Sequence, residues 1–176
     1  MKTRPTATVA PASSNLILRE PGIDDGAAVH QLVRACPPLD LNSPYAYLLL
    51  CAHHARTCVV AEGPAGIAGF ISAYRLPADP EVVFVWQVAV APVARGQGLA
   101  LRMLEHLLAR PALAGWRRLE TTITPCNKAS RRVFETLAAR LQLRLSESAF
   151  FSKEDFADPQ HEPEMLIRIG PCIPQA

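Results

Sequence analysis

Two short polar clusters in this chain contain residue types that can bind charged groups and transfer protons. Residues 40–43 read DLNS, and residues 161–164 read HEPE. Carboxylates hold ammonium groups through charge-assisted hydrogen bonds, and a carboxylate or an imidazole can also take a proton from them. Each cluster has a structural explanation as well, because Asp, Asn and Ser cap helices and charged turns are common on protein surfaces. The clusters therefore gain a functional interpretation only together with the rest of the chain.

A glycine loop behind a buried strand offers a second kind of chemistry, the binding of an anion. The apolar run FVWQVAV at 84–90 predicts a strand, and a proline ends it. The loop RGQG at 95–98 follows, and then a helix is predicted over 99–109. The first N–H groups of a helix have no internal partner, so together with glycine and arginine they favour a pyrophosphate. The loop lacks the Gly-Lys-Ser/Thr ending of triphosphatases and the third glycine of dinucleotide folds.

Two further polar groups lie in or beside predicted strands. Trp86 and Gln87 are neighbours in the apolar run, so strand alternation predicts that they point to opposite faces. A buried glutamine must find hydrogen-bond partners, whereas a tryptophan in a strand usually serves packing. After a strand predicted over 118–123, Asn127 is expected to cap the next helix.

The remaining pattern predicts one α/β domain over residues 16–171, because strands and helices are interleaved without repeats or a linker. Asp24 or Asp25 is expected to cap the first helix. A hairpin is expected at 63–66, and residues 76–80 are expected to connect it to the central strand. The other predicted strands are 16–19, 57–62, 67–74, 143–151 and 165–169, and the other helices are 25–36, 44–54 and 127–141.

Composition excludes several classes of protein. The chain has 176 residues, 49% hydrophobic and 19% charged, and its net charge of +2 is too small to favour a nucleic acid or a membrane surface. Residues 1–15 and 172–176 are predicted to be tails, the first of them disordered and without a signal peptide. The five cysteines show no C-x-x-C pair, which favours reduced thiols in a cytoplasm. They are Cys36, Cys51, Cys58, Cys126 and Cys172.

Taken together, these motifs resemble the diaminobutyrate acetyltransferases of ectoine biosynthesis, which are GNAT acetyltransferases. The spacing Arg95-x-x-Gly98-x-Ala100 is similar to their coenzyme A loop. The resemblance covers about residues 16–171, and its other motifs are PPLDLNSPYAYLLLCAHH, FVWQVAVAPVARGQGLA, LETTITPCNKASRRVF and HEPEMLIRIGP. It implies a mixed central sheet with helices on both faces and a splayed pair of parallel strands. It also implies a homodimer without a metal that transfers acetyl from acetyl-CoA to the 4-amino group of L-2,4-diaminobutyrate.

The resemblance and the charges of such a substrate suggest roles for individual residues. The ammonium ends need carboxylates, which Asp40, Glu162 and Glu164 supply, and Trp86 could wall the methylene chain. Donors for the substrate carboxylate are expected from Asn42, Tyr45, Thr121 and His161. The cofactor-binding residues are expected to be Gln87, Val88, Ala89, Val90, Arg95, Gly96, Gln97, Gly98, Leu99, Ala100, Asn127 and Ser130.

The catalytic roles follow from the need for a neutral amine. Glu164 is the first candidate for the general base, and Glu162 or His161 the next. A backbone N–H near Val88 is expected to stabilise the oxyanion, and Tyr45 to protonate the thiolate. Two other functions stay open from the sequence. One is an acetyltransferase for another small diamino acid or a polyamine, and the other is an acetyl-CoA-binding module without turnover.

Overall fold

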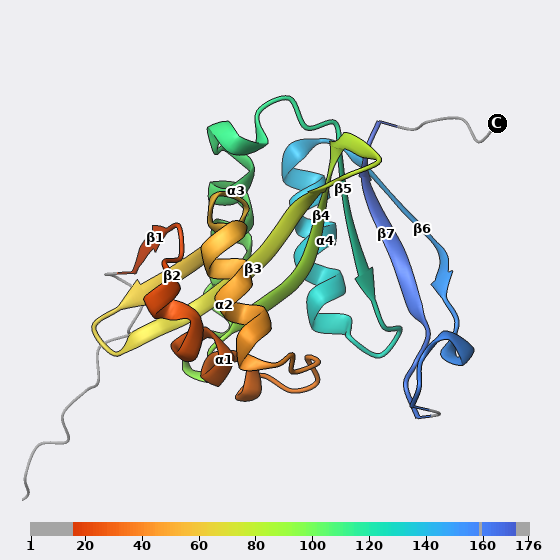
Figure 1. The fold of residues 1–176 in the computed structure, drawn as a ribbon. Helices are drawn as coiled ribbons and strands as arrows, with labels where there is room; N and C mark the ends of the chain where they lie inside the picture. Colours follow the sequence, from red (N-terminus) through yellow and green to blue (C-terminus); the bar gives the residue numbers. More distant parts are fainter. Residues whose placement is uncertain (1–15, 159, 172–176) are drawn as a thin grey trace, which may run out of the picture.

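Seven strands form one mixed sheet in the order β1-β2-β3-β4-β5-β7-β6 (Figure 1). The computed structural model describes residues 16–158 and 160–171, so the two predicted tails and Cys172 lie outside the described residues. Among the described strands, β4 and β5 pair in parallel and the other neighbours pair antiparallel. The strands are β1 (Ile17–Arg19), β2 (Val59–Gly63), β3 (Gly66–Leu76), β4 (Asp79–Val90), β5 (Arg118–Ile123), β6 (Arg144–Phe151) and β7 (Glu164–Gly170).

Helices cover both faces of this sheet, as predicted. Figure 1 shows α1 (Gly26–Arg34) and α2 (Pro44–His53) in front, and α3 (Leu99–Leu108) and α4 (Lys128–Leu141) behind. Successive side chains of β2 point to opposite faces of the sheet. Val60 packs with α1 and α2, whereas Val59 and Ala61 pack in the larger core under α3 and α4. Short 3₁₀ turns complete the chain: η1 (Ile23–Asp25), η2 (Ala55–Thr57), η3 (Pro92–Ala94), η4 (Pro111–Leu113) and η5 (Lys153–Asp155).

The parallel pair β4 and β5 separates part-way along its length. Pairing runs from Val82 with Arg118 to Phe84 with Glu120 and then stops. Beyond that point the two strands diverge, which opens the sheet toward the ends of both strands (Figure 1). The connection between α1 and α2 and the connection between β6 and β7 both lie at this open end. The predicted splay is confirmed, and it brings the two polar clusters of the sequence to one place.

A β-bulge in β4 changes which way its side chains point. Ser72 of β3 pairs with Gln87, but the next residue of β3 pairs with Val85, so Trp86 is the extra residue. Val85 lies in the core under α3, whereas Ala89 packs under α1 and α2. Trp86 follows Val85 and therefore points to the opposite face, and Gln87 lies two residues before Ala89 and therefore shares its face. Both side chains thus lie on the face that α1 and α2 cover. The prediction that they point to opposite faces is therefore wrong.

Three other local predictions need correction. β4 begins at Asp79 instead of residue 84, and β3 extends to Leu76, because the two strands pair almost to their shared turn. The second strand begins at Val59, since a 3₁₀ turn occupies residues 55–57.

Asp25 does not cap α1 with its side chain. Its carboxylate accepts the N–H of Gly22 at 2.7 Å and pairs with Arg19 at 2.7 Å, which holds the pKa of Asp25 below its usual value.

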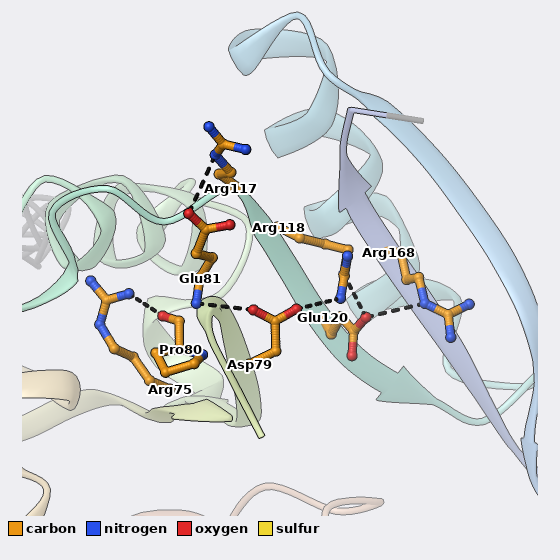
Figure 2. Close-up of polar contacts among 8 residues, drawn as sticks. All are labelled: Arg75, Asp79, Pro80, Glu81, Arg117, Arg118, Glu120 and Arg168. Atoms are coloured by element: carbon orange, nitrogen blue, oxygen red, sulfur yellow. Dashed lines mark hydrogen bonds and ion pairs between the residues drawn. The ribbon is translucent and has the colours of Figure 1, made fainter. Parts of the chain in front are cut away.

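A network of charges holds β4, β5 and β7 together at the closed end of the splay (Figure 2). Glu120 is 7% exposed, and its Oε1 accepts Nε of Arg118 at 2.9 Å and Nε of Arg168 at 3.1 Å. Arg118 also reaches Oδ2 of Asp79 at 3.2 Å, which links β5 to the start of β4. Glu81 makes a separate ion pair with Arg117 at 3.5 Å, and both of these side chains are well exposed.

We expect Glu120→Ala to lower the free energy of unfolding by about 2 to 4 kcal/mol, because two arginines lose a buried shared acceptor. Urea denaturation with linear extrapolation measures the change. Glu81→Ala is the matched control, since removing an exposed ion pair should cost less than about 1 kcal/mol. Equal losses in the two variants would show that burial of Glu120 adds nothing.

Candidate active site

A cleft of about 650 Å³ lies between the β4 end of the splay, the start of α3 and the first turns of α4. Nine of the twelve predicted cofactor residues line it: Val88, Val90, Arg95, Gly96, Gly98, Leu99, Ala100, Asn127 and Ser130. The cleft therefore joins the glycine loop to the helix cap predicted at Asn127. Asn127 does cap α4, because its Oδ1 accepts the N–H of Ser130 at 3.1 Å.

The glycine loop has the backbone conformation that anion binding needs. Gly96 and Gly98 have φ of 74° and 69°, in the left-handed region where a side chain is strained. Helical hydrogen bonding in α3 begins with the Arg102 N–H, which donates to the Gly98 carbonyl at 3.1 Å. The N–H groups of residues 99–101 thus have no acceptor inside the helix and point toward the loop. With Arg95 beside them, they form a site that fits a pyrophosphate.

Three predicted cofactor residues are not brought to the cleft lining. Gln87 is buried on the opposite face, where its amide contacts α2 and the loop before it. Ala89 is fully buried in the small core under α1 and α2. Gln97 is exposed, and its Nε2 donates to the Val93 carbonyl within the same loop at 3.2 Å. The geometry thus does not support cofactor contacts for the side chains of Gln87 and Ala89.

Glu164 is a half-buried carboxylate at the open end of the splay. Its Oε2 is buried and has no hydrogen-bond partner within the described residues. Burial raises the pKa of Glu164, and the Thr122 hydroxyl and His161 oppose that rise. A carboxyl group that is desolvated and short of partners is suited to exchange a proton.

His161 and Asp40 meet beside Glu164, although they come from distant parts of the chain. His161 Nε2 lies 3.6 Å from Oδ2 of Asp40, and its Nδ1 lies 2.6 Å from the Glu162 carbonyl. The bond to the Glu162 carbonyl raises the pKa of His161, and Asp40 adds to the rise. Phe156 stacks on the imidazole ring with centroids 3.7 Å apart. His161 is therefore held in place and keeps its proton to a higher pH than a free imidazole does, which suits charge pairing better than general-base catalysis.

The other predicted substrate residues differ in position. Trp86 is 43% exposed on the face that carries Glu164. Thr121 pairs with Ile167, a residue of the core under α3 and α4, so its side chain points away from Glu164. Its neighbour Thr122 lies on the Glu164 side. Tyr45 is 67% exposed in the first turn of α2, and its predicted roles stay predictions.

Glu162 and Asn42 each take part in a hydrogen bond that involves a backbone N–H group. Oε2 of Glu162 accepts the N–H of Cys126 at 3.2 Å, which ties the β7 approach to the start of α4. The N–H of Asn42 donates to the Tyr47 hydroxyl at 3.3 Å. These contacts make Glu162 a weaker candidate for the base than Glu164, whose Oε2 carries no such contact.

The open side of β4 presents a backbone donor to the cleft. The Ala91 N–H donates to the carbonyl of Ala68 in β3 at 2.9 Å, so the backbone groups of residues 89 and 91 point toward β3. The backbone groups of Val88 and Val90 then point the other way, into the splay. Cys36 Sγ and Arg95 Nε indeed bond to the Val90 carbonyl at 3.3 and 3.1 Å. The N–H of Val88 therefore faces the space beyond the end of the β4–β5 pairing.

Comparison with known proteins shows the family to which this chain belongs. Residues 27–138 match the Acetyltransferase (GNAT) family. The chain is 56% identical over 172 residues to the L-2,4-diaminobutyric acid acetyltransferase of Bordetella parapertussis, covering 96% of this chain and 92% of the relative. The Halomonas elongata enzyme of the same name is 46% identical over 166 residues, with 94% and 86% covered. The chain belongs to the L-2,4-diaminobutyric acid acetyltransferases of the GNAT family.

Solved structures agree with this family assignment. The diaminobutyrate acetyltransferase of Paenibacillus lautus, in complex with L-2,4-diaminobutyric acid and coenzyme A, is 43% identical with a TM-score of 0.87. The match covers 92% of this chain and 98% of that one. A putative phosphinothricin N-acetyltransferase, 24% identical with a TM-score of 0.66 over 92% of this chain and 100% of that one, shares the fold alone. The predicted GNAT fold is confirmed.

The sequence pattern missed several residues of this GNAT site. The segment that precedes Asp40 lines the cofactor cleft, and so do parts of α4. The apolar spacing of residues 36–39 gave no signal for this, because their position depends on how α1 and α2 are connected. The additional lining residues are Cys36, Pro37, Pro38, Leu39, Ala94, Leu101, Ala129, Arg132, Val133, Phe134 and Thr136.

Other features of this GNAT chain bear on the remaining predictions. Within the described ranges, no helix combines the length and the apolar composition needed to cross a membrane. Among residues 16–158 and 160–171, no group of three or more His, Cys, Asp or Glu side chains is arranged to hold a metal ion. The four cysteines that the structure describes are free thiols, and Cys126 is the exposed one among them.

Proposed function

We propose that this protein transfers the acetyl group of acetyl-CoA to the 4-amino group of L-2,4-diaminobutyrate, giving N4-acetyl-L-2,4-diaminobutyrate for ectoine biosynthesis. One observation carries the proposal: Glu164, whose buried Oε2 has no hydrogen-bond partner among the described residues, lies with Asp40 and His161 at the open end of the splay. The names of the relatives and the ligands of the Paenibacillus lautus complex support the same substrates.

The charges around Glu164 suit a short molecule with two ammonium groups and a carboxylate. Asp40 is 78% exposed in its side chain, so its negative charge is available to an ammonium group. Protonated His161, held by the Glu162 carbonyl, can pair with the substrate carboxylate. Trp86 offers an apolar and cation-attracting wall on the same face of the sheet. The two ammonium groups of the substrate would thus be distinguished by the carboxylate beside one of them, which His161 can pair with.

Glu164 is our candidate for the general base. An alkyl ammonium has a pKa well above neutral and must lose a proton before its nitrogen can attack the thioester. Burial raises the pKa of Glu164, so its carboxylate accepts a proton more readily than an exposed glutamate does. The amine nitrogen then bonds to the acetyl carbon and releases its second proton to solvent, and the carbon–sulfur bond breaks to release the coenzyme thiolate.

The backbone of β4 is suited to stabilise the charge that develops on the acetyl oxygen. The Val88 N–H points into the splay, where the end of β4–β5 pairing leaves it a donor for an oxyanion. Gly96, Gly98 and the start of α3 would hold the pyrophosphate. Tyr45 is proposed as the acid that protonates the thiolate, and Glu162 as a residue that keeps the loop before β7 in position.

Two expectations from the sequence remain proposals. The predicted homodimer is supported by Tyr45, Leu48 and Leu49, which leave an apolar stripe of α2 exposed by 37% to 67%. Reduced thiols in the described part of the chain are consistent with the predicted cytoplasmic location.

A mass-resolved assay with acetyl-CoA tests the function. We expect rapid single acetylation of L-2,4-diaminobutyrate at its 4-amino group, and slow or no acetylation of ornithine, lysine and putrescine. A site with a group that pairs with the carboxylate should reject putrescine most strongly, because the protein group is then left unpaired. Faster turnover of another amine would contradict the substrate assignment. Bound acetyl-CoA without any product would show a binding module.

A further inference from the structure

We propose that Gln87 and Tyr47 form a buried relay that positions Asp40 for diaminobutyrate, so that affinity for this substrate depends on the relay. The inference rests on the proposed function, since it concerns the same substrate site. Neither residue is expected to touch the substrate, and both act as positioning residues. The relay replaces the cofactor-binding role that the sequence suggested for Gln87.

Three hydrogen bonds make up the relay. Nε2 of Gln87 donates to the Asp40 carbonyl at 2.6 Å, and the Tyr47 hydroxyl donates to Oε1 of Gln87 at 3.2 Å. The Asn42 N–H in turn donates to the Tyr47 hydroxyl at 3.3 Å. Gln87 is 6% exposed and Tyr47 is 0% exposed, so these groups have little access to water. Loss of Gln87 or of the Tyr47 hydroxyl removes a partner from the other buried side chain, which makes the bonds depend on one another.

The Asp40 segment needs such an anchor. Residues 40–43 have no regular secondary structure and lie between α1 and α2. The Asp40 side chain is 78% exposed, and its ion pair with His161 is long at 3.6 Å. An exposed pair of this kind contributes little to holding a loop. The bond from Gln87 instead fixes the backbone carbonyl of Asp40, which sets the direction in which its carboxylate leaves the chain. A carboxylate held in advance binds a substrate ammonium with a smaller loss of entropy.

The preceding part of the same loop is held by separate contacts. Cys36 Sγ donates to the Val90 carbonyl at 3.3 Å, and the Leu39 N–H donates to the Cys36 carbonyl at 3.1 Å. Cys36 and Leu39 line the cofactor cleft, whereas Asp40 does not. Loss of the relay should therefore loosen the substrate side of the loop and leave the cofactor side in place. This selectivity distinguishes a positioning role from a general packing role.

Three variants test the relay. Gln87→Met removes both amide contacts with little change in volume, and Tyr47→Phe removes the hydroxyl alone. Ser72→Ala is the matched control, because Ser72 pairs opposite Gln87 and its buried hydroxyl has no partner among the described residues. KM and kcat are measured for both substrates. Calorimetry with coenzyme A present gives the affinity for diaminobutyrate without turnover, and thermal melting shows whether each variant is folded.

We expect Gln87→Met and Tyr47→Phe each to raise the KM for diaminobutyrate about tenfold, with kcat and the KM for acetyl-CoA changed by less than about twofold. In an Asp40→Ala background, Gln87→Met should raise the diaminobutyrate KM no further, because its effect acts through Asp40. Ser72→Ala should match the parent enzyme. If one relay variant fails to fold, the other carries the test.

Several results would overturn the relay. A parallel rise in both KM values would indicate general loosening, and an undiminished effect in the Asp40→Ala background would show that Gln87 acts elsewhere. A normal KM in Gln87→Met beside a raised KM in Asp40→Ala would reject the relay and leave the proposed function standing. If the parent enzyme acetylates no diaminobutyrate, the proposed function fails, and the calorimetric affinities of the variants still decide the relay.

Discussion

Glu164→Gln is expected to lower kcat/KM for diaminobutyrate by about 10²- to 10⁴-fold, the usual contribution of a general base. The amide has the same shape as the carboxylate but cannot take the ammonium proton. Glu164 does not line the cofactor cleft, so acetyl-CoA should bind normally, which calorimetry can measure. Glu162→Gln is the matched control, and its smaller loss would reflect only the bond to the Cys126 N–H. Near-normal turnover by Glu164→Gln would remove Glu164 as the base.

The pH dependence of the parent enzyme gives a second test of Glu164. Burial raises the pKa of this carboxyl group, so the acid side of the kcat/KM profile should lie above the range of an ordinary glutamate. As the pH falls through the raised pKa, the carboxylate binds a proton and the rate falls. An acid limb at the position of an exposed glutamate would contradict this assignment.

The same pKa shift has a consequence for stability. A raised carboxyl pKa means that the folded protein binds the proton more tightly than the unfolded chain does. The resulting cost of burying the charge is fully present above the raised pKa and disappears as the pH falls below the unfolded value. Glu164→Gln removes the charge, so at neutral pH we expect it to melt at the same or a higher temperature. A much lower melting temperature would attribute its lost activity to unfolding.

Gly98→Val is expected to weaken acetyl-CoA binding about 10- to 100-fold. Gly98 has φ of 69° at the N-cap of α3, and a β-branched residue is strained there. Relief of that strain would rotate the N–H groups at the start of α3 away from the pyrophosphate. Apart from its two chain neighbours, no heavy atom of the described residues lies within 4 Å of an added Cβ, so there is room for the side chain and the effect falls on the loop conformation. Calorimetric titration with acetyl-CoA measures the change.

Gly66→Val is the control that separates loop strain from cofactor binding. Gly66, the first residue of β3 after the turn from β2, has φ of 103°, and again no heavy atom of the described residues beyond its chain neighbours lies within 4 Å of an added Cβ. Both variants should lose stability, because each forces a branched side chain into the left-handed region. Only Gly98→Val should lose affinity for acetyl-CoA. Equal affinities in the two variants would show that the conformation of the loop at Gly98 does not hold the cofactor.

Local pattern was sufficient for much of the fold and for the cofactor loop. The buried face of α3, the hairpin at 63–66 and the cap at Asn127 depend on neighbouring residues, and the structure contains all three. The limits of β4 were predicted less well, since its first residues are held by pairing with β3. Pairing between strands depends on contacts that local hydrophobicity does not record.

Tertiary structure alone decided how the candidate substrate site is built. The sequence by itself determined that Asp40, His161 and Glu164 carry suitable chemistry, because their types and short motifs are visible in it. Only the fold brought Asp40 to within ion-pair distance of His161 and buried Oε2 of Glu164 with no hydrogen-bond partner among the residues that the structure describes. Only the bulge at Trp86 turned Gln87 toward the Asp40 loop, because one extra residue reverses strand alternation. Such positions depend on register and packing across the whole sheet, which no local spacing specifies.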